Sequence, residues 1–158
     1  AGLVLPLVYN TAGYDSPEAL ALLDGVVDIY MPDMKYGDDA AARRFSHVPD
    51  YVTVNQAAVR EMHRQVGDLV LDDEGIAQRG LLIRHLVLPG DVAASETVLR
   101  FIADELGPDT YLNLLDQYRP CYRADEISEL DHPLGRVEFE RVRTIAAELG
   151  LHRLDPSE

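Results

Sequence analysis

The sequence is poor in cysteine and has no long hydrophobic run. Its one cysteine, Cys121, excludes an internal disulfide and cannot by itself provide a cysteine-ligated metal cluster. A chain with so little cysteine fits a reducing compartment, and we expect a cytoplasmic protein. No apolar run approaches the ~20 residues that a membrane span needs, and no basic-then-apolar signal sequence opens the chain. We therefore expect no membrane partner.

Basic residues are also scarce. The chain has 14 Lys and Arg against 28 Asp and Glu, a formal net charge of −14. Such a surface repels the phosphate backbone of nucleic acids. We therefore expect no nucleic acid among its partners.

What is present suits one globular domain spanning residues 1–158. Hydrophobic residues make up 47% of the chain and charged residues 27%, which is ordinary for a folded domain with its own core. Four apolar runs end in polar clusters, and we interpret them as strands of a parallel sheet. They are LVLPLVYNTAGYD (3–15), DIYMPDMK (28–35), LLIRHLVLPGD (81–91) and TYLNLLDQYRP (110–120).

Helical patterns alternate with these runs. Strands are predicted at 3–9, 26–31, 81–88 and 111–115, with a further short strand at 151–154. Pro6 favours an edge position or a bulge for the first strand. Helices are predicted at 17–25, 40–45, 52–66, 96–106 and 135–149, with Ser16, Asp38 or Asp39, and Ser95 as N-caps. Residues 69–77 predict a small β-hairpin. A complete barrel takes ~200 residues or more, so the sheet is either open or part of a barrel.

Polar residues at the strand ends are the candidate site. Asp33 and Lys35 are two apart, so they share one side of an extended chain, at the strand end where α/β folds bind ligands. The alternative is a solvated ion pair worth ~0–1 kcal/mol. Arg84 lies in a core strand and needs a partner. His85 points to the opposite face and is expected to be a packed or a surface histidine. Cys121 is expected to be an inert small apolar residue.

Four blocks carry a resemblance to a known family: YNTAGYD (9–15), DIYMPDMKYGD (28–38), EMHRQVGDLVLDDEGIAQRGLLIRHLVLPG (61–90) and YLNLLDQYRPCYRA (111–124). In order and spacing they resemble the second half of radical S-adenosylmethionine (SAM) enzymes of the pyruvate formate-lyase activating type. The resemblance implies a partial (β/α) barrel, TIM-like, lacking its first strands and carrying the hairpin as an insertion. The family's C-x3-C-x2-C and glycine-rich segments are absent, and both would precede Ala1.

The resemblance also implies a chemistry. A [4Fe–4S] cluster on the absent N-terminal half would bind SAM, and an electron donor such as flavodoxin or ferredoxin would drive its cleavage to a 5′-deoxyadenosyl radical. That radical would abstract hydrogen from a substrate, in the best-known members a glycine of a partner glycyl radical enzyme. The implied enzyme is an oxidoreductase. This chain would supply residues that position SAM, would contribute no catalytic residue or metal ligand, and would be inactive without its cluster-bearing half.

Residue by residue, the resemblance implies cofactor-binding roles. Asn10 and Thr11 match positions near the methionine carboxylate and a monovalent cation, with Asn10 replacing an acidic residue, and Met31 matches a residue whose carbonyl joins that cation site. Asp33 and Lys35 match the pair that contacts the ribose hydroxyls and the methionine carboxylate, as their hydrogen-bonding chemistry allows.

Two further positions complete the set. Arg84 matches a cofactor contact on the strand that flanks the nucleoside. Tyr118 stands where the family has a cofactor-contacting histidine, so stacking or a hydroxyl contact is implied. Two alternatives to the enzyme remain: a non-catalytic module that binds a nucleoside or a protein, and an unrelated open α/β domain that binds another anion.

Overall fold

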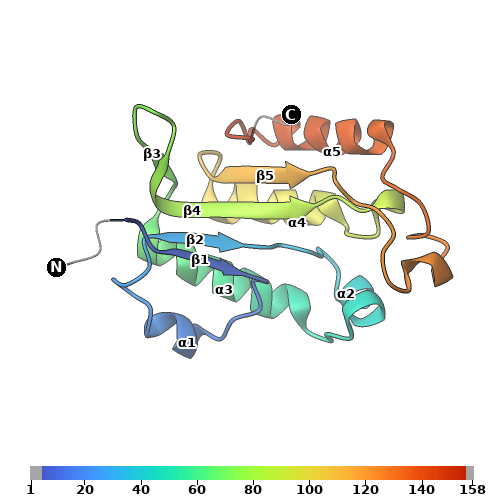
Figure 1. The fold of residues 1–158 in the computed structure, drawn as a ribbon, viewed down its shortest axis with the longest axis horizontal. Coiled ribbons are helices and arrows are strands. Elements are labelled where there is room, and N and C mark those ends of the chain that lie inside the picture. Colours follow the sequence, from blue (N-terminus) through green and yellow to red (C-terminus); the bar gives the residue numbers. More distant parts are fainter. Residues whose placement is uncertain (1–4, 156–158) are drawn as a thin grey trace.

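A mostly parallel sheet is the centre of the structure. The computed structural model describes residues 5–155, and Leu3 and Val4 of the first predicted strand lie outside them. Four parallel strands are ordered β1, β2, β4, β5 (Figure 1). They are β1 Val8–Thr11, β2 Ile29–Pro32, β4 Ala77–Leu86 and β5 Tyr111–Leu115, with β3 Val70–Leu71 antiparallel to the start of β4. The predicted parallel α/β architecture is confirmed.

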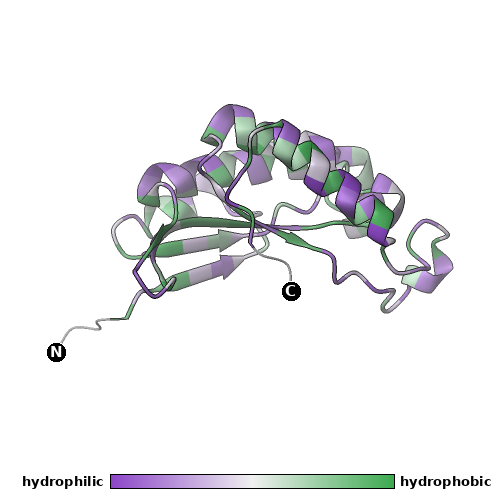
Figure 2. Cartoon of the chain, turned by 90° about the horizontal axis from the view of Figure 1, so that it is seen from above, coloured by the Kyte–Doolittle hydropathy of each residue, from purple (hydrophilic) through white to green (hydrophobic). Residues whose placement is uncertain are grey.

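The helices lie on one face of this sheet (Figures 1 and 2). They are α1 Pro17–Ala21, α2 Asp39–Ser46, α3 Tyr51–Val66, α4 Ser95–Phe101 and α5 Arg136–Glu148. Turns of 3₁₀ helix occupy Pro89–Asp91 and Ala124–Glu126, and a π-helical turn occupies Ile102–Leu106. No helix in residues 5–155 covers the opposite face of the sheet, which we call the open face. Within the same residues, no helix has the length and apolar character to cross a membrane.

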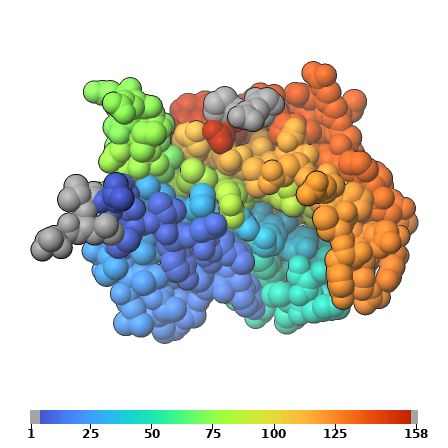
Figure 3. All heavy atoms as spheres, viewed as in Figure 1, coloured from blue at the N-terminus to red at the C-terminus, as the bar shows by residue number. Residues whose placement is uncertain are grey.

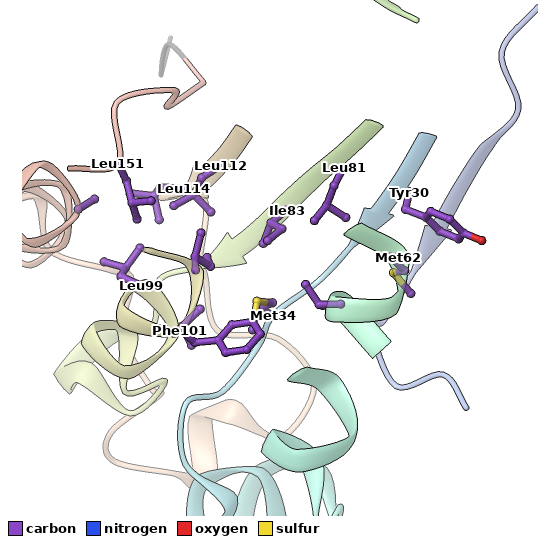
Figure 4. Close-up of a cluster of buried hydrophobic side chains, with 14 of the residues drawn as sticks. Tyr30, Met34, Met62, Leu81, Ile83, Leu99, Phe101, Leu112, Leu114 and Leu151 are labelled. Carbon is purple, nitrogen blue, oxygen red and sulfur yellow. The ribbon is translucent and has the colours of Figure 1, made fainter. Parts of the chain in front are cut away.

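The core lies between the sheet and the helices. Because side chains alternate along a strand, Leu81 and Ile83 of β4 and Leu112 of β5 face the helices and are fully buried. They pack with Met62 of α3 and Leu99 of α4 (Figure 4). The intervening residues point to the open face and are half-buried. Burial of the alternate apolar positions fixes which face each strand turns to the helices.

The expected helix starts are confirmed for two helices and wrong for a third. Ser16 Oγ accepts from the Ala19 N–H at 3.1 Å, and Asp38 Oδ1 accepts from the Ala40 N–H at 2.9 Å. Ser95 is not an N-cap. It is the first residue of α4, after Ala94, and its buried hydroxyl contacts a histidine of β4. That tertiary contact takes the hydroxyl away from the helix terminus.

Several predicted boundaries need correction. The first two strands begin later than predicted, at Val8 and Ile29. The second arm of the hairpin is continuous with the core strand β4, so the hairpin is an extension of that strand. The predicted 96–106 helix changes to π-helical geometry at Ile102. The predicted 151–154 strand is reduced to one bridge, between Leu112 and Leu154. Hydrogen bonds to neighbouring strands set these limits, and apolar runs do not encode them.

His85 is fully buried on the helix side of β4, so it is a packed and not a surface histidine. Its Nδ1 lies 2.6 Å from the Met34 carbonyl oxygen, and its Nε2 lies 2.9 Å from Ser95 Oγ. Since a carbonyl can only accept, Nδ1 carries the proton and Nε2 accepts from the Ser95 hydroxyl. Burial lowers the pKa of His85 below its ordinary value. The neutral ring is therefore part of the folded structure.

We predict that acid weakens the fold through His85. The unfolded chain takes up a proton near pH ~6.5 and the folded chain resists it, so stability is complete above that pH and falls below it, by up to about 1.4 kcal/mol per pH unit. Urea unfolding at pH 7.5 and 5.5 should show a smaller loss for His85→Asn than for the wild type. The same pH dependence in both proteins would contradict this.

Within residues 5–155, β1 pairs only with β2 and forms an edge of the sheet. Leu7 and Val8 are 42% and 54% exposed there. An edge strand presents backbone donors and acceptors to other chains, and exposed apolar side chains beside it favour contact. This edge is where association between copies of the chain would begin.

We predict that the 158-residue chain associates through this edge. Light scattering should give a mass above that of one chain, rising with concentration. Val8→Lys should lower it, because an edge lysine opposes strand pairing. Val137→Lys on α5, where Val137 is 83% exposed, is the control and should leave the mass unchanged. A wild-type chain that stays monomeric at high concentration would disprove the prediction.

Candidate functional site

Three neighbouring parallel strands bring Asn10, Asp33 and Arg84 together. Asp33 follows β2 directly and forms a bridge pair with Arg84 of β4. Arg84 Nε donates to Asp33 Oδ1 at 2.8 Å, and Arg84 Nη2 donates to Asn10 Oδ1 of β1 at 2.9 Å. Nη2 also lies 2.7 Å from Asp33 Oδ1 as part of the ion pair. Because His85 faces the helices, Arg84 beside it points to the open face. Arg84 was expected to need a partner, and that partner is Asp33, with Asn10 as a second acceptor.

Lys35 completes the cluster from the same chain segment. Its Nζ lies 2.8 Å from Asp33 Oδ2, so the two oxygens of Asp33 each accept from a different cation. One carboxylate and two cations give this cluster a formal charge of +1 in a chain of net charge −14. The Lys35 side chain is 43% exposed and that of Asp33 21%. The surplus positive charge is accessible and suits an anionic group on a ligand.

A cavity of about 470 Å³ adjoins the cluster. Asp33, Lys35 and Arg84 form one wall, and the segment after β5 forms another. In Figure 3 that segment (orange) lies beside α2 (turquoise), and Arg44 of α2 contacts Glu129 at 2.6 Å. The remaining wall is apolar and is formed by Leu86, Leu88, Leu115 and Leu130. Charged groups at one side and apolar groups at the other are typical of small-molecule sites.

Tyr118 lines the same cavity. Its hydroxyl donates to the Leu130 carbonyl at 2.7 Å, and burial raises the pKa of this phenol, so the ring stays neutral. The hydroxyl is already engaged, so the ring face is the part of Tyr118 that suits a ligand. Of the two contacts implied for Tyr118, stacking of its ring on a ligand is therefore the one that this arrangement allows.

Thr11 and Met31 lie nearby but do not join the cluster. Thr11 Oγ1 donates to Asp15 at 2.6 Å and accepts from the Gly13 N–H at 3.1 Å, so its hydroxyl serves the turn after β1. Met31 pairs in register with Asn10 and lies on the face opposite to buried Tyr30. The structure therefore brings together four of the seven expected residues, with Tyr118 across the cavity, and their ligand roles stay predictions.

Two features that bear on the site are visible in the sequence but were not among its predictions. Lys35 is the single lysine of the chain, whose other 13 basic residues are arginines. Asn55 lies on the buried face of α3 with Tyr51, Ala58 and Met62, and a polar residue at an apolar helical position is the signal that identifies it. Cys121, expected to be a small apolar residue, is exposed at the rim of the cavity.

The described residues offer no metal centre of their own. Within 5–155, no group of three or more His, Cys, Asp and Glu side chains is placed to hold a metal ion. With one cysteine in the sequence, the donor set does not fit a [4Fe–4S] cluster, which is held by cysteine thiolates. Any cluster would need ligands from another polypeptide segment.

Comparison with known proteins finds a likeness over most of the chain. No protein-family model matches the chain. The chain is 31% identical over 148 residues to an uncharacterized protein of Methanocaldococcus jannaschii, and the match covers 93% of this chain and 39% of that relative. The chain thus spans about two fifths of the length of the curated relative that it matches.

Proposed function

We propose that this chain is the SAM-positioning part of a radical SAM enzyme of the pyruvate formate-lyase activating type. The observation that carries the proposal is the convergence of Asn10, Asp33, Lys35 and Arg84 at the carboxyl ends of adjacent parallel strands. This is the edge at which (β/α) barrels place their active sites. The family resemblance of the same residues supports it.

The layout of the sheet supports a partial barrel. A doubly wound sheet has helices on both faces, and here the helices lie on one face (Figure 2). The open face carries residues in register, with Asn10 beside Met31, Asp33 beside Arg84, and Arg84 beside Asn113. In a barrel, the face of the sheet without helices is the interior, and side chains of neighbouring strands lie in rows there. The open face of this sheet fits that arrangement.

The cluster has the groups that SAM requires. The Asp33 carboxylate suits the two ribose hydroxyls, and the Lys35 ammonium suits the methionine carboxylate. In the structure these two side chains pair with each other at 2.8 Å. Binding therefore exchanges partners: Lys35 turns to the ligand carboxylate and frees Asp33 Oδ2 for the hydroxyls, while Arg84 stays on Asp33 and Asn10.

The apolar wall suits the adenine. Leu86, Leu88 and Leu115 with the ring of Tyr118 exclude water from one side of the cavity. Its volume of about 470 Å³ lies within the range of ~300–1,000 Å³ typical of small-molecule pockets. The residues of this chain thus bind and orient the nucleoside.

Bound SAM supplies a radical that abstracts hydrogen. Its cleavage to that radical needs a [4Fe–4S] cluster, for which this chain has too few cysteine ligands. The proposal therefore includes a cluster-bearing N-terminal half, an electron donor such as flavodoxin or ferredoxin, and a substrate such as a glycyl radical enzyme, in the cytoplasm. A second candidate is a non-catalytic module that binds a nucleoside. The accessible charged group of Asp33, Lys35 and Arg84 favours this candidate, because all three side chains belong to this chain.

Calorimetry with SAM on the 158-residue chain tests the site. Asp33→Asn should weaken binding by about ten- to a hundredfold, because it removes a charge-assisted acceptor worth ~1.5–3 kcal/mol. Asp73→Asn, an identical change at the exposed hairpin tip, should bind as the wild type does. Equal affinity in Asp33→Asn and the wild type, or no binding by the wild type, would refute the proposal.

The role of Lys35 is tested by comparing two ligands. Lys35→Gln should weaken SAM by about tenfold, because a charge-assisted bond to the methionine carboxylate is lost. The same variant should bind 5′-deoxyadenosine, which lacks that carboxylate, at least as tightly as the wild type, because Asp33 Oδ2 no longer pairs with Lys35. Equal losses for both ligands would show that Lys35 does not recognise the amino-acid end.

A further inference from the structure

The backbone of Asp33, Met34 and Lys35 continues beyond the last residue of β2 and is held by buried side chains. Asn55 Nδ2 donates to the Asp33 carbonyl at 3.0 Å and to the Gly13 carbonyl at 2.9 Å. The Tyr51 hydroxyl accepts from the Lys35 N–H at 2.8 Å and donates to the Asp33 carbonyl at 3.3 Å. Two side chains of α3 thus reach through the core to the segment that carries the cluster.

The middle residue of this segment is held from β4. His85 Nδ1 donates to the Met34 carbonyl at 2.6 Å, and the Met34 N–H donates to the Arg84 carbonyl at 2.9 Å. The Ser95 hydroxyl at 2.9 Å from Nε2 fixes the ring. Neighbouring elements therefore hold all three residues of the segment.

These groups are deeply buried: Tyr51 is 3% exposed, Asn55 1% and His85 0%. A buried polar side chain costs stability unless its hydrogen bonds are made. Asn55 Oδ1 has no hydrogen-bond partner among the described residues, so an apolar side chain would suit packing better. Gly13 closes over the same point, where a Cβ would lie 2.3 Å from the Asp33 carbonyl oxygen. Tyr51 and His85 thus make their hydrogen bonds with the segment or with Ser95, and Asn55 holds the segment through its amide nitrogen alone.

We propose that Tyr51, Asn55 and His85 are positioning residues that fix the backbone from which Asp33 and Lys35 project, and we call these three residues the clamp. The inference rests on the proposed function for the ligand that the cluster receives. Binding requires the Lys35 side chain to leave Asp33 while the carboxylate stays in place. A fixed backbone confines the ordering cost to the lysine side chain.

Tyr51→Phe tests the clamp with little change of shape. It removes both hydroxyl contacts with the segment and leaves the ring in the core. The matched control is Tyr30→Phe on β2, because the Tyr30 hydroxyl is also engaged, with Gln65 Oε1 at 2.6 Å, but does not contact the segment. Since Lys35 is the single lysine, ¹⁵N-lysine labelling gives one backbone amide signal, which belongs to the N–H that Tyr51 accepts.

We expect the Lys35 amide to exchange with solvent about three- to tenfold faster in Tyr51→Phe than in Tyr30→Phe, the change for one typical hydrogen bond. SAM affinity should fall by a similar factor in Tyr51→Phe and stay unchanged in Tyr30→Phe. His85→Leu should also lose affinity, and His85→Asn should regain it, because an asparagine amide can donate to the Met34 carbonyl from the place of Nδ1.

The two proposals fail in different ways. If Lys35 exchange and SAM affinity are the same in Tyr51→Phe and Tyr30→Phe, the clamp is wrong. It is also wrong if affinity follows thermal stability across all four variants, since the groups would then act on the fold as a whole. If the wild type does not bind SAM, the proposed function fails, and unchanged Lys35 exchange in Tyr51→Phe would overturn the clamp independently.

Discussion

The pairing of Arg84 with Asp33 is the constraint on which the site depends. A guanidinium in a central strand needs an anionic partner, because leaving it unpaired in a half-buried position is costly. Asp33 provides that partner one strand away, and the two contacts at 2.7 and 2.8 Å fix the end of β2 against β4. Lys35 and Asn10 are then drawn to the same point, one by its spacing from Asp33 and the other by its contact with Arg84.

The two faces of the sheet have different roles: one forms the core and the other carries the site. The helix side is apolar and supplies the core, with Leu81, Ile83 and Leu112 fully buried. Arg84 of the same strand points to the open face, and the residues on either side of it, Ile83 and His85, are buried on the helix side. Since parallel strands end at the same edge, polar residues placed at their ends meet without any long connecting segment. The site is thus a consequence of strand direction and side-chain alternation.

Polar groups buried between the sheet and the helices link the core to the site. His85 and Asn55 occupy positions that helical and strand periodicity assign to apolar residues, and both donate to the Asp33–Lys35 backbone. His85 has partners for both ring nitrogens, and a buried polar group whose hydrogen bonds are made specifies one arrangement strongly. Both lie behind the charged cluster and donate to the segment that carries it, which is the placement that a positioning role requires.

The sequence by itself determined the alternation of strands and helices, the parallel α/β class and the position of the strand-end polar residues, because periodicity and strand-end chemistry are local properties. It also required a partner for Arg84. Only the tertiary structure decided that this partner is Asp33, that Ser95 serves His85 and not a helix cap, that Thr11 turns to Asp15, and that Tyr51 and Asn55 reach the site. Those choices depend on contacts between residues far apart in the chain, and hydrogen bonding across elements overrides local preference.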